Sequence, residues 1–272
     1  MQGPSSGRFR EKGAVVTGAS RGIGRAIAHA LAAEGFHLLL VARDREALER
    51  VRGEIHGHHG SVETLELDLT APAAASIVAR VAGEALKEPY LLVNNAGSLR
   101  SQPFDQRPIE EIDHELTLDL VAPIRLTHAL LPALRARRAG HVVHLGSAIV
   151  DVPLLHNAVY VSAKTGLQAF STSLDRELQP HGIRSTVLEP IFVRTDLGCP
   201  PGETEGPIRA IARRHPRWVI EPEAVAAACV RALYRPRPIV RVPAAWAVGR
   251  PLVRAGARLG RVPAARLDAP PR

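Results

Sequence analysis

Short apolar runs rich in β-branched residues alternate with longer helical patterns along most of the chain. The runs lie at residues 14–17, 36–41, 62–67, 90–93, 141–145, 183–188 and 239–242. The helical patterns between them lie at 22–34, 44–56, 72–86, 109–136, 158–180 and 222–234. Because strands and helices in strict alternation form right-handed crossovers, this order predicts an α/β fold with a seven-stranded parallel sheet covered by helices on both faces.

The composition supports one large core. Of the 272 residues, 46% are hydrophobic and 23% are charged, which excludes collagen-like, disordered and small disulfide-stapled proteins. Cys199 and Cys229 have neither disulfide-framework nor metal-ligand spacing, so the sequence predicts a reducing compartment and no metal site. No segment approaches the roughly 18 to 20 apolar residues of a membrane span. We therefore expect a cytoplasmic protein, at most peripheral to a membrane.

The positive charge is concentrated at the C-terminal end. The chain carries a formal charge of +8, and residues 231–272 hold ten arginines and one acid, which is +9 for that segment and about −1 for the rest. Aromatic residues make up 4% of the chain, and no nucleic-acid recognition motif is present. The basic balance therefore does not predict a nucleic-acid partner.

Two segments depart from the alternation. Residues 194–221 are rich in Gly, Pro and charge, and an insertion of this length in an α/β domain predicts a lid, with a solvated loop as the alternative. We expect one domain over 1–242 and a basic extension over 243–272, in which arginines oppose apolar residues at helical spacing. That extension is expected to pack on the protein's own core or, alternatively, to contact an anionic membrane surface peripherally.

A glycine-rich turn joins the first predicted strand to the first helix. Gly18, Gly22 and Gly24 permit a tight turn and close approach of the backbone to a phosphate, with Ser20, Arg21 and Ile23 between them. The following helix N-terminus offers free N–H groups and a partial positive charge. The turn therefore predicts a pyrophosphate-binding site.

The end of the second predicted strand indicates which dinucleotide binds. The position where an acid would hold an adenosine 2′-hydroxyl is Ala42, and Arg43 follows it. Arg43, together with Arg21 in the turn, favours a 2′-phosphate through charge-assisted contacts. We expect NADP(H) rather than NAD(H); in the alternative, Asp44 holds the ribose and the arginines are solvated.

Tyr160 and Lys164 are spaced so that they share one face of a helix. The ammonium can therefore lie near the phenol, whose ordinary pKa is about 10, and lower it. A phenol tuned in this way can exchange a proton with an alcohol or carbonyl. The alternative is a buried tyrosine beside a lysine that reaches to solvent.

With these motifs the chain resembles the short-chain dehydrogenases/reductases. The resemblance covers residues 12–240 and rests on TGASRGIG at 17–24, Asp68, NNAG at 94–97, Ser147, the Tyr160/Lys164 pair, Pro190 and Thr195. It implies a doubly wound Rossmann-type domain that transfers hydride between a nicotinamide and a carbonyl or alcohol carbon. It also implies a homodimer or homotetramer.

The resemblance assigns roles to individual residues. Tyr160 is the expected proton donor, Lys164 holds the nicotinamide ribose, and Ser147 binds the substrate oxygen. The cofactor is expected to contact the glycine-rich turn, Arg43, Tyr160, Lys164 and, further along the chain, Asp68, Leu69, Asn94, Ala96, Gly97, Pro190, Val193 and Thr195.

The sequence departs from the family pattern at two positions. Asp119 stands where the family usually has an asparagine, so we include it among the catalytic candidates and expect its carboxylate to raise the pKa values of Lys164 and Tyr160. Ile191 follows Pro190 where glycine is commoner, which adds bulk beside the nicotinamide or simply packs in the core.

The segment between Ser147 and Tyr160 is mainly apolar, which favours a hydrophobic small-molecule carbonyl or alcohol as the substrate. The arginines of 209–217 favour an anionic handle on that substrate unless they are merely solvated. A dinucleotide-binding scaffold or sensor with the same fold and no turnover remains the alternative function.

Overall fold

The computed structural model describes residues 8–55, 60–86, 89–151, 155–197 and 219–245. Its centre is a seven-stranded sheet in the order β3-β2-β1-β4-β5-β6-β9, in which every pairing is parallel. The strands are β1 (Gly13–Thr17), β2 (His37–Ala42), β3 (Val62–Glu66), β4 (Pro89–Asn94), β5 (Gly140–Leu145), β6 (Ile183–Pro190) and β9 (Ile239–Val242). The predicted seven-stranded parallel sheet is confirmed.

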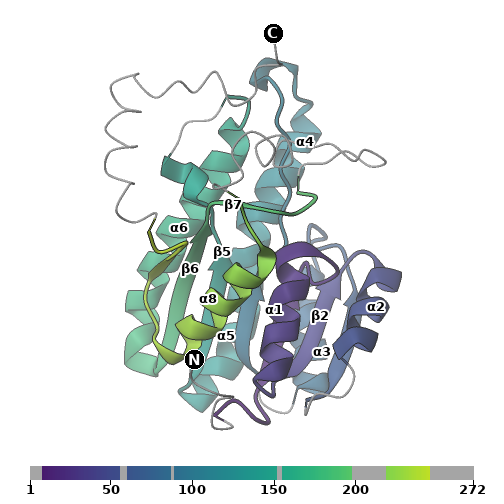
Figure 1. The fold of residues 1–272 in the computed structure, drawn as a ribbon, viewed down its shortest axis with the longest axis vertical. Helices are drawn as coiled ribbons and strands as arrows, with labels where there is room; N and C mark the ends of the chain where they lie inside the picture. The colour runs from purple at the N-terminus through teal and green to yellow at the C-terminus, as the bar shows by residue number, and fades with distance from the viewer. Residues whose placement is uncertain (1–7, 56–59, 87–88, 152–154, 198–218, 246–272) are drawn as a thin grey trace.

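Helices cover both faces of the sheet (Figure 1). One face carries α1 (Gly22–Ala33), α2 (Arg45–Ile55) and α8 (Pro222–Tyr234), and the other carries α3 (Ala74–Ala85), α5 (Ala122–Arg137) and α6 (Ala158–Leu178). Successive strand residues serve opposite layers, because the side-chain period of a strand is two. Val16 of β1 packs in the first core cluster and its neighbour Val15 in the second.

The sheet order places a crevice at its centre. From β1 the chain proceeds outward through β2 and β3 and then returns to β4 on the other side of β1. At such a reversal the loops that leave the carboxyl ends of β1 and β4 diverge, and α/β proteins bind ligands there. The glycine-rich turn follows β1 and the NNAG sequence closes β4, so both predicted motifs lie at this crevice.

The segment 109–136 was predicted as one helix, and the structure corrects this. It forms α4 (Ile109–Leu116), a π-helical turn η2 (Thr117–Val121) and α5. Pro123 lacks the N–H that would bond to the carbonyl of residue 119 in a continuous α-helix. The wider turn brings Asp119 to the interior, where it is 0% exposed.

The insertion after β6 begins and ends in a small second sheet. β7 (Phe192–Val193) and β8 (Val219–Ile220), which were not predicted, pair in parallel beside the crevice. Arg194 donates its backbone N–H to the Ile220 carbonyl at 2.9 Å. The remainder of the predicted lid and most of the basic extension, residues 198–218 and 246–272, lie outside the described residues.

Short helical turns complete the described chain at η1 (Phe104–Gln106), η3 (Ala148–Asp151) and η4 (Gln179–His181). Within the described ranges, none of the helices has both the length and the apolar character needed to cross a membrane.

Candidate active site

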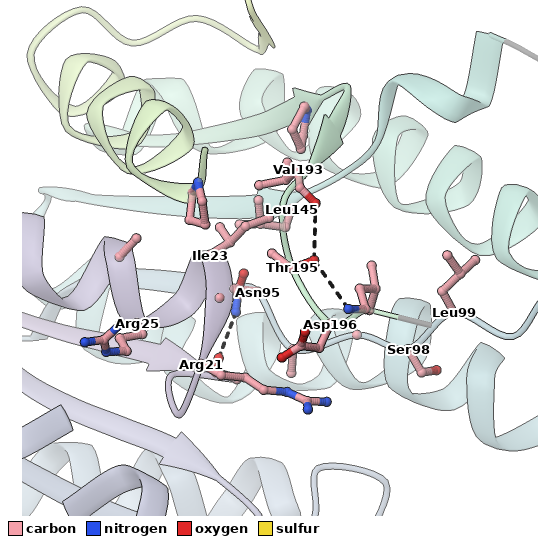
Figure 2. Close-up of a pocket in the computed structure, with 18 of the residues that line it drawn as sticks. Arg21, Ile23, Arg25, Asn95, Ser98, Leu99, Leu145, Val193, Thr195 and Asp196 are labelled. Atoms are coloured by element: carbon pink, nitrogen blue, oxygen red, sulfur yellow. Dashed lines mark hydrogen bonds between the residues drawn. The ribbon is translucent and has the colours of Figure 1, made fainter. Parts of the chain in front are cut away.

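A cavity of about 1490 Å³ follows the carboxyl edge of the sheet (Figure 2). Its walls extend from Arg43 and Asp68, after β2 and β3, past the glycine-rich turn to Ser147 and Tyr160. All but two of the residues predicted from the sequence line it: Gly18, Ser20, Arg21, Gly22, Ile23, Arg43, Asp68, Leu69, Ala96, Gly97, Asp119, Ser147, Tyr160, Lys164, Pro190, Val193 and Thr195. The two exceptions are Gly24 and Asn94.

The glycine-rich turn has the geometry that a phosphate requires. Gly18 adopts φ +62°, and a Cβ there would lie 2.9 Å from the Cα of Ala96. A Cβ on Gly24 would lie 2.1 Å from the Gly18 carbonyl oxygen. Gly24 is therefore needed so that α1 can pack closely against the turn, and it does not line the cavity. In the described part of the chain, no side chain caps the N-terminus of α1 and its first turn has no acid. These N–H groups can therefore receive a pyrophosphate.

Asn94 points into the interior and not into the cavity. It is 2% exposed, and its amide donates to Thr127 Oγ1 at 3.2 Å and lies 3.2 Å from His144 Nδ1. Its neighbour Asn95 lines the cavity and donates to the carbonyls of Thr17 and Gly18 at 2.9 and 3.1 Å. Adjacent residues at a strand end face opposite sides. Asn95 therefore lines the cavity, and Asn94 packs in the interior.

The end of the cavity beside β2 and β3 is lined by charged side chains of both signs. Arg43 is exposed and lines the cavity beside Ala42 and Asp68. Asp44 accepts the backbone N–H of Ala47 at 2.9 Å and so caps the N-terminus of α2. With Asp44 engaged in this cap, Arg43 is the better placed of the two residues to contact a ribose substituent.

Tyr160, Ser147 and Lys164 converge at the opposite end. Tyr160 and Lys164 are 6% and 4% exposed, and the ammonium lies 5.6 Å from the centre of the phenol ring. The Ser147 side chain hydrogen-bonds to Tyr160. Lys164 Nζ donates to the Leu145 carbonyl at 3.0 Å and forms an ion pair with Asp119 Oδ1 at 2.9 Å. An ammonium has three N–H donors, so one remains for a ligand in the cavity.

Burial governs the pKa of Tyr160. It raises that pKa above its ordinary value, and Asp119 adds to the increase, whereas Lys164 and the hydrogen bond from Ser147 lower it. The net direction is opposite to the effect of Lys164 taken alone. Burial has the largest single effect on Lys164 and acts to lower its pKa, but Asp119, Tyr160 and Glu115 together outweigh it, so the pKa lies above its usual value. The Tyr160 hydroxyl therefore remains protonated at neutral pH and is suited to donate.

Asp119 is contacted from two sides. Besides Lys164, the backbone N–H and the hydroxyl of Ser98 donate to Oδ2 at 2.9 and 3.1 Å. The contact from Ser98 was not predicted. The sequence did carry a signal for it, because an aspartate in place of the usual asparagine needs hydrogen-bond donors for its carboxylate. The close packing extends to Gly97, where a Cβ would lie 2.6 Å from Asp119 Oδ1.

The comparisons with known proteins agree with this arrangement. The family model for short chain dehydrogenases matches residues 12–205. A 3-oxoacyl-(acyl-carrier-protein) reductase of Escherichia coli is 35% identical over 189 residues, which cover 70% of this chain and 76% of that protein. The chain belongs to the short-chain dehydrogenase/reductase family of oxidoreductases.

Two further relatives extend the comparison. A short chain dehydrogenase of Pseudocercospora fijiensis is 35% identical over 200 residues, 71% of this chain, and the match spans 63% of that protein's length. The structure of a short-chain dehydrogenase from Sphingobium yanoikuyae in complex with NADPH superposes with a TM-score of 0.78 at 29% identity, covering 92% of this chain and 94% of the other.

Proposed function

We propose that the protein is an NADP(H)-dependent reductase of a hydrophobic carbonyl compound, or catalyses the reverse oxidation. The observation that carries the proposal is the convergence of Ser147, Tyr160 and Lys164 at one end of a cavity whose other end is a phosphate-binding turn. The bound nicotinamide would supply or accept hydride. A relative named as a reductase of 3-oxoacyl groups, which are carbonyl compounds, supports the reaction class.

The chain's own residues supply the proton and the positioning. Ser147 and Tyr160 would hydrogen-bond to the substrate oxygen, and the Tyr160 hydroxyl would donate its proton as negative charge develops there. The remaining N–H of Lys164 would hold a ribose hydroxyl, while Leu145 and Asp119 fix the ammonium in place. Burial of Tyr160 excludes water from the proton that is transferred.

A panel of aliphatic, aromatic and 3-oxoacyl carbonyl compounds tests the proposal, with oxidation of NADPH and NADH followed side by side. We expect turnover with at least one apolar carbonyl and a preference for NADPH. NADPH binding without turnover on any compound, or in reverse on the alcohols, would favour the scaffold alternative. We further propose a cytoplasmic homodimer or homotetramer built from one domain over 1–242, which size-exclusion chromatography with light scattering would test for subunit number.

Arg43→Ala is expected to weaken NADPH binding about tenfold and to leave NADH binding unchanged, because Arg43 would make a charge-assisted contact to the 2′-phosphate. Fluorescence titration of both dinucleotides measures the effect. Arg45→Ala is the matched control: Arg45 is an exposed arginine two positions further on that does not line the cavity. Equal losses for both dinucleotides would contradict the assigned preference.

Asp119→Asn is expected to move the pH profile of alcohol oxidation to lower pH. The carboxylate raises the pKa values of both Tyr160 and Lys164, so its removal lets the phenol lose its proton at lower pH. The measurement is the rate of alcohol oxidation with NADP⁺ across pH 6 to 10, an interval on the acid side of the ordinary tyrosine pKa of about 10, where the rate rises with the fraction of phenol that has lost its proton. A profile that overlays the parent's would remove this role of Asp119.

A further inference from the structure

A buried ion pair lies outside the reacting groups. The side chains of Arg107 and Glu115 are each 2% exposed and join the loop before α4 to the last turn of α4. Among the eight residues of α4, Glu115 alone is buried. A charged side chain therefore fills the one fully buried position of this helix, while Ile112 and Leu116 are half-buried. Burial raises the pKa of Glu115, against the lowering effect of Arg107.

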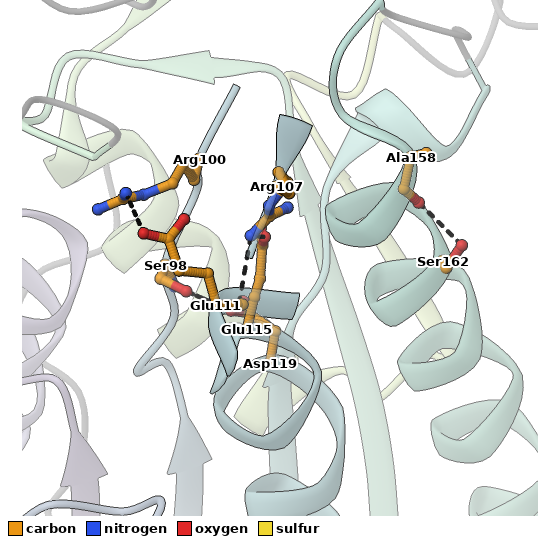
Figure 3. A network of polar contacts seen from close by, with 8 residues as sticks. All are labelled: Ser98, Arg100, Arg107, Glu111, Glu115, Asp119, Ala158 and Ser162. Carbon is orange, nitrogen blue, oxygen red and sulfur yellow. Dashed lines mark hydrogen bonds and ion pairs between the residues drawn. The ribbon is translucent and has the colours of Figure 1, made fainter. Parts of the chain in front are cut away.

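The same helix region holds the segment that leaves β4, residues 98–102, which we term the wall segment (Figure 3). Ser98 donates twice to Asp119, four residues after Glu115 and therefore on the same helix face. The backbone N–H of Arg100 lies near enough to the Glu115 carboxylate to act, with Arg107, to lower the pKa of Glu115. Further along the loop, Arg107 forms its ion pair with Glu115. The loop is therefore fixed at Ser98 to Asp119 and at Arg107 to Glu115, two carboxylates that are one helical turn apart.

The other side of the wall segment contacts the loop before α6. The Gln102 N–H donates to the His156 carbonyl at 3.1 Å, and the Asn157 amide donates to Ser101 Oγ at 3.3 Å. Leu99 and Ser101 line the cavity together with Asn157 at the end occupied by Tyr160. Arg100, between them, is exposed and pairs with Glu111. Leu99 and Ser101 therefore line the cavity, whereas Arg100 between them pairs with the helix.

We propose that the Arg107–Glu115 pair positions the wall segment and thereby sets the room for the apolar group of the carbonyl substrate, with Leu99 as the side chain that contacts this group. The inference rests on the proposed function. It goes further by naming the residues that discriminate between substrates. Neither Arg107 nor Glu115 lines the cavity, so both act through the wall segment. A misplacement of about 1 Å at such a wall can change a rate about 10²-fold.

The test replaces both charges at once, in Arg107→Met/Glu115→Leu. Apolar residues of similar volume often preserve the stability of a buried pair, whereas removing one partner leaves an unpaired charge. We expect kcat/KM for 4-nitroacetophenone to rise about tenfold relative to that for propanal, mainly through KM, as the wall loosens. Leu99→Ala is expected to shift the ratio in the same direction. The dissociation constant of NADPH is expected to stay unchanged, whereas the pH profile moves to lower pH because Glu115 also raises the pKa values of Tyr160 and Lys164.

Arg100→Met is the matched control, because it removes an ion pair between the same two segments on the surface, where the arginine side chain is 58% exposed. Hydrogen exchange of the 98–102 amides provides a readout that does not need turnover, and we expect it to accelerate in the double variant alone. Unchanged exchange, or an unchanged substrate ratio in an active enzyme, overturns the inference. If the parent reduces no carbonyl compound, the proposed function fails, and exchange still decides whether the pair holds the segment.

Discussion

Replacing Tyr160 by phenylalanine is expected to lower kcat for carbonyl reduction about 10²- to 10⁴-fold, the range that a positioned general acid contributes. This corresponds to about 3 to 5 kcal/mol of transition-state stabilisation. The ring would remain packed at the cavity wall, where Tyr160 is 6% exposed, and the hydroxyl alone would be lost. The glycine-rich turn and Arg43, the proposed phosphate and adenosine contacts, line the other end of the cavity, so the NADPH dissociation constant should not change.

Steady-state turnover and NADPH fluorescence titration measure the two quantities on the same preparation. Tyr90→Phe is the matched control, because Tyr90 loses the same hydroxyl in an aromatic cluster with Phe9 and Phe36, away from the cavity lining. We expect the control to keep full turnover. A Tyr160→Phe protein that also keeps most of its turnover would show that another group supplies the proton, and the proposed mechanism would be wrong.

The fold followed from the sequence because strands such as β2 and β4 are nearly continuous in apolar residues and alternate with helical patterns. The exceptions have local causes. The π-helical turn at 117–121 depends on the missing N–H of Pro123, and a helical periodicity that persists through residues 109–136 conceals it. β7 and β8 have two residues each, too few for any periodicity to show.

The candidate site was predictable where a motif names residue types at fixed spacing, as at Gly18, Tyr160 and Lys164. It was less predictable where side-chain direction decides, as for Asn94, which faces His144 and not the cavity. The carboxylates Glu115 and Asp119 are four residues apart, which signals a shared helix face. Two of their partners, Ser98 and Arg107, however, lie in a loop whose course no local pattern specifies.

Acidification is expected to destabilise the protein strongly between about pH 6.5 and 4, because of two buried histidines. Burial lowers the pKa of His141 to about 4 and that of His144 to about 3, from an ordinary 6.5, with Arg184 and Lys164 respectively adding to the effect. The pKa of each histidine is lower in the folded state than in the unfolded state. Between these values the unfolded state binds more protons, so the free energy of unfolding falls as the pH falls. Each histidine then costs about 1.4 kcal/mol per pH unit, and the two together about 4 kcal/mol at pH 5.

A loss of this size is comparable with the total stability of many domains, about 5 to 15 kcal/mol. The lowered pKa of Asp175 has its main effect on stability below the ordinary value of 3.8 and so outside the window. Urea unfolding at pH 7.5, 6 and 5 measures the slope, each pH lying above, near or below the ordinary histidine pKa of about 6.5.

Two substitutions show how much each histidine contributes to the slope of unfolding free energy against pH. His144→Asn keeps an acceptor for the amide of Asn94, and His141→Gln keeps a partner for Thr186 Oγ1, which lies 2.8 Å from His141 Nε2. Each is expected to reduce the slope by one proton, whereas His128→Gln, at an exposed position on α5, is expected to leave it unchanged. Because both histidines lie in β5, the strand that ends at Leu145 beneath Lys164, the same titration should release the ammonium from its carbonyl partner as the sheet opens. Loss of NADPH binding should therefore follow unfolding across these pH values; binding lost well before unfolding would place the acid-sensitive group elsewhere.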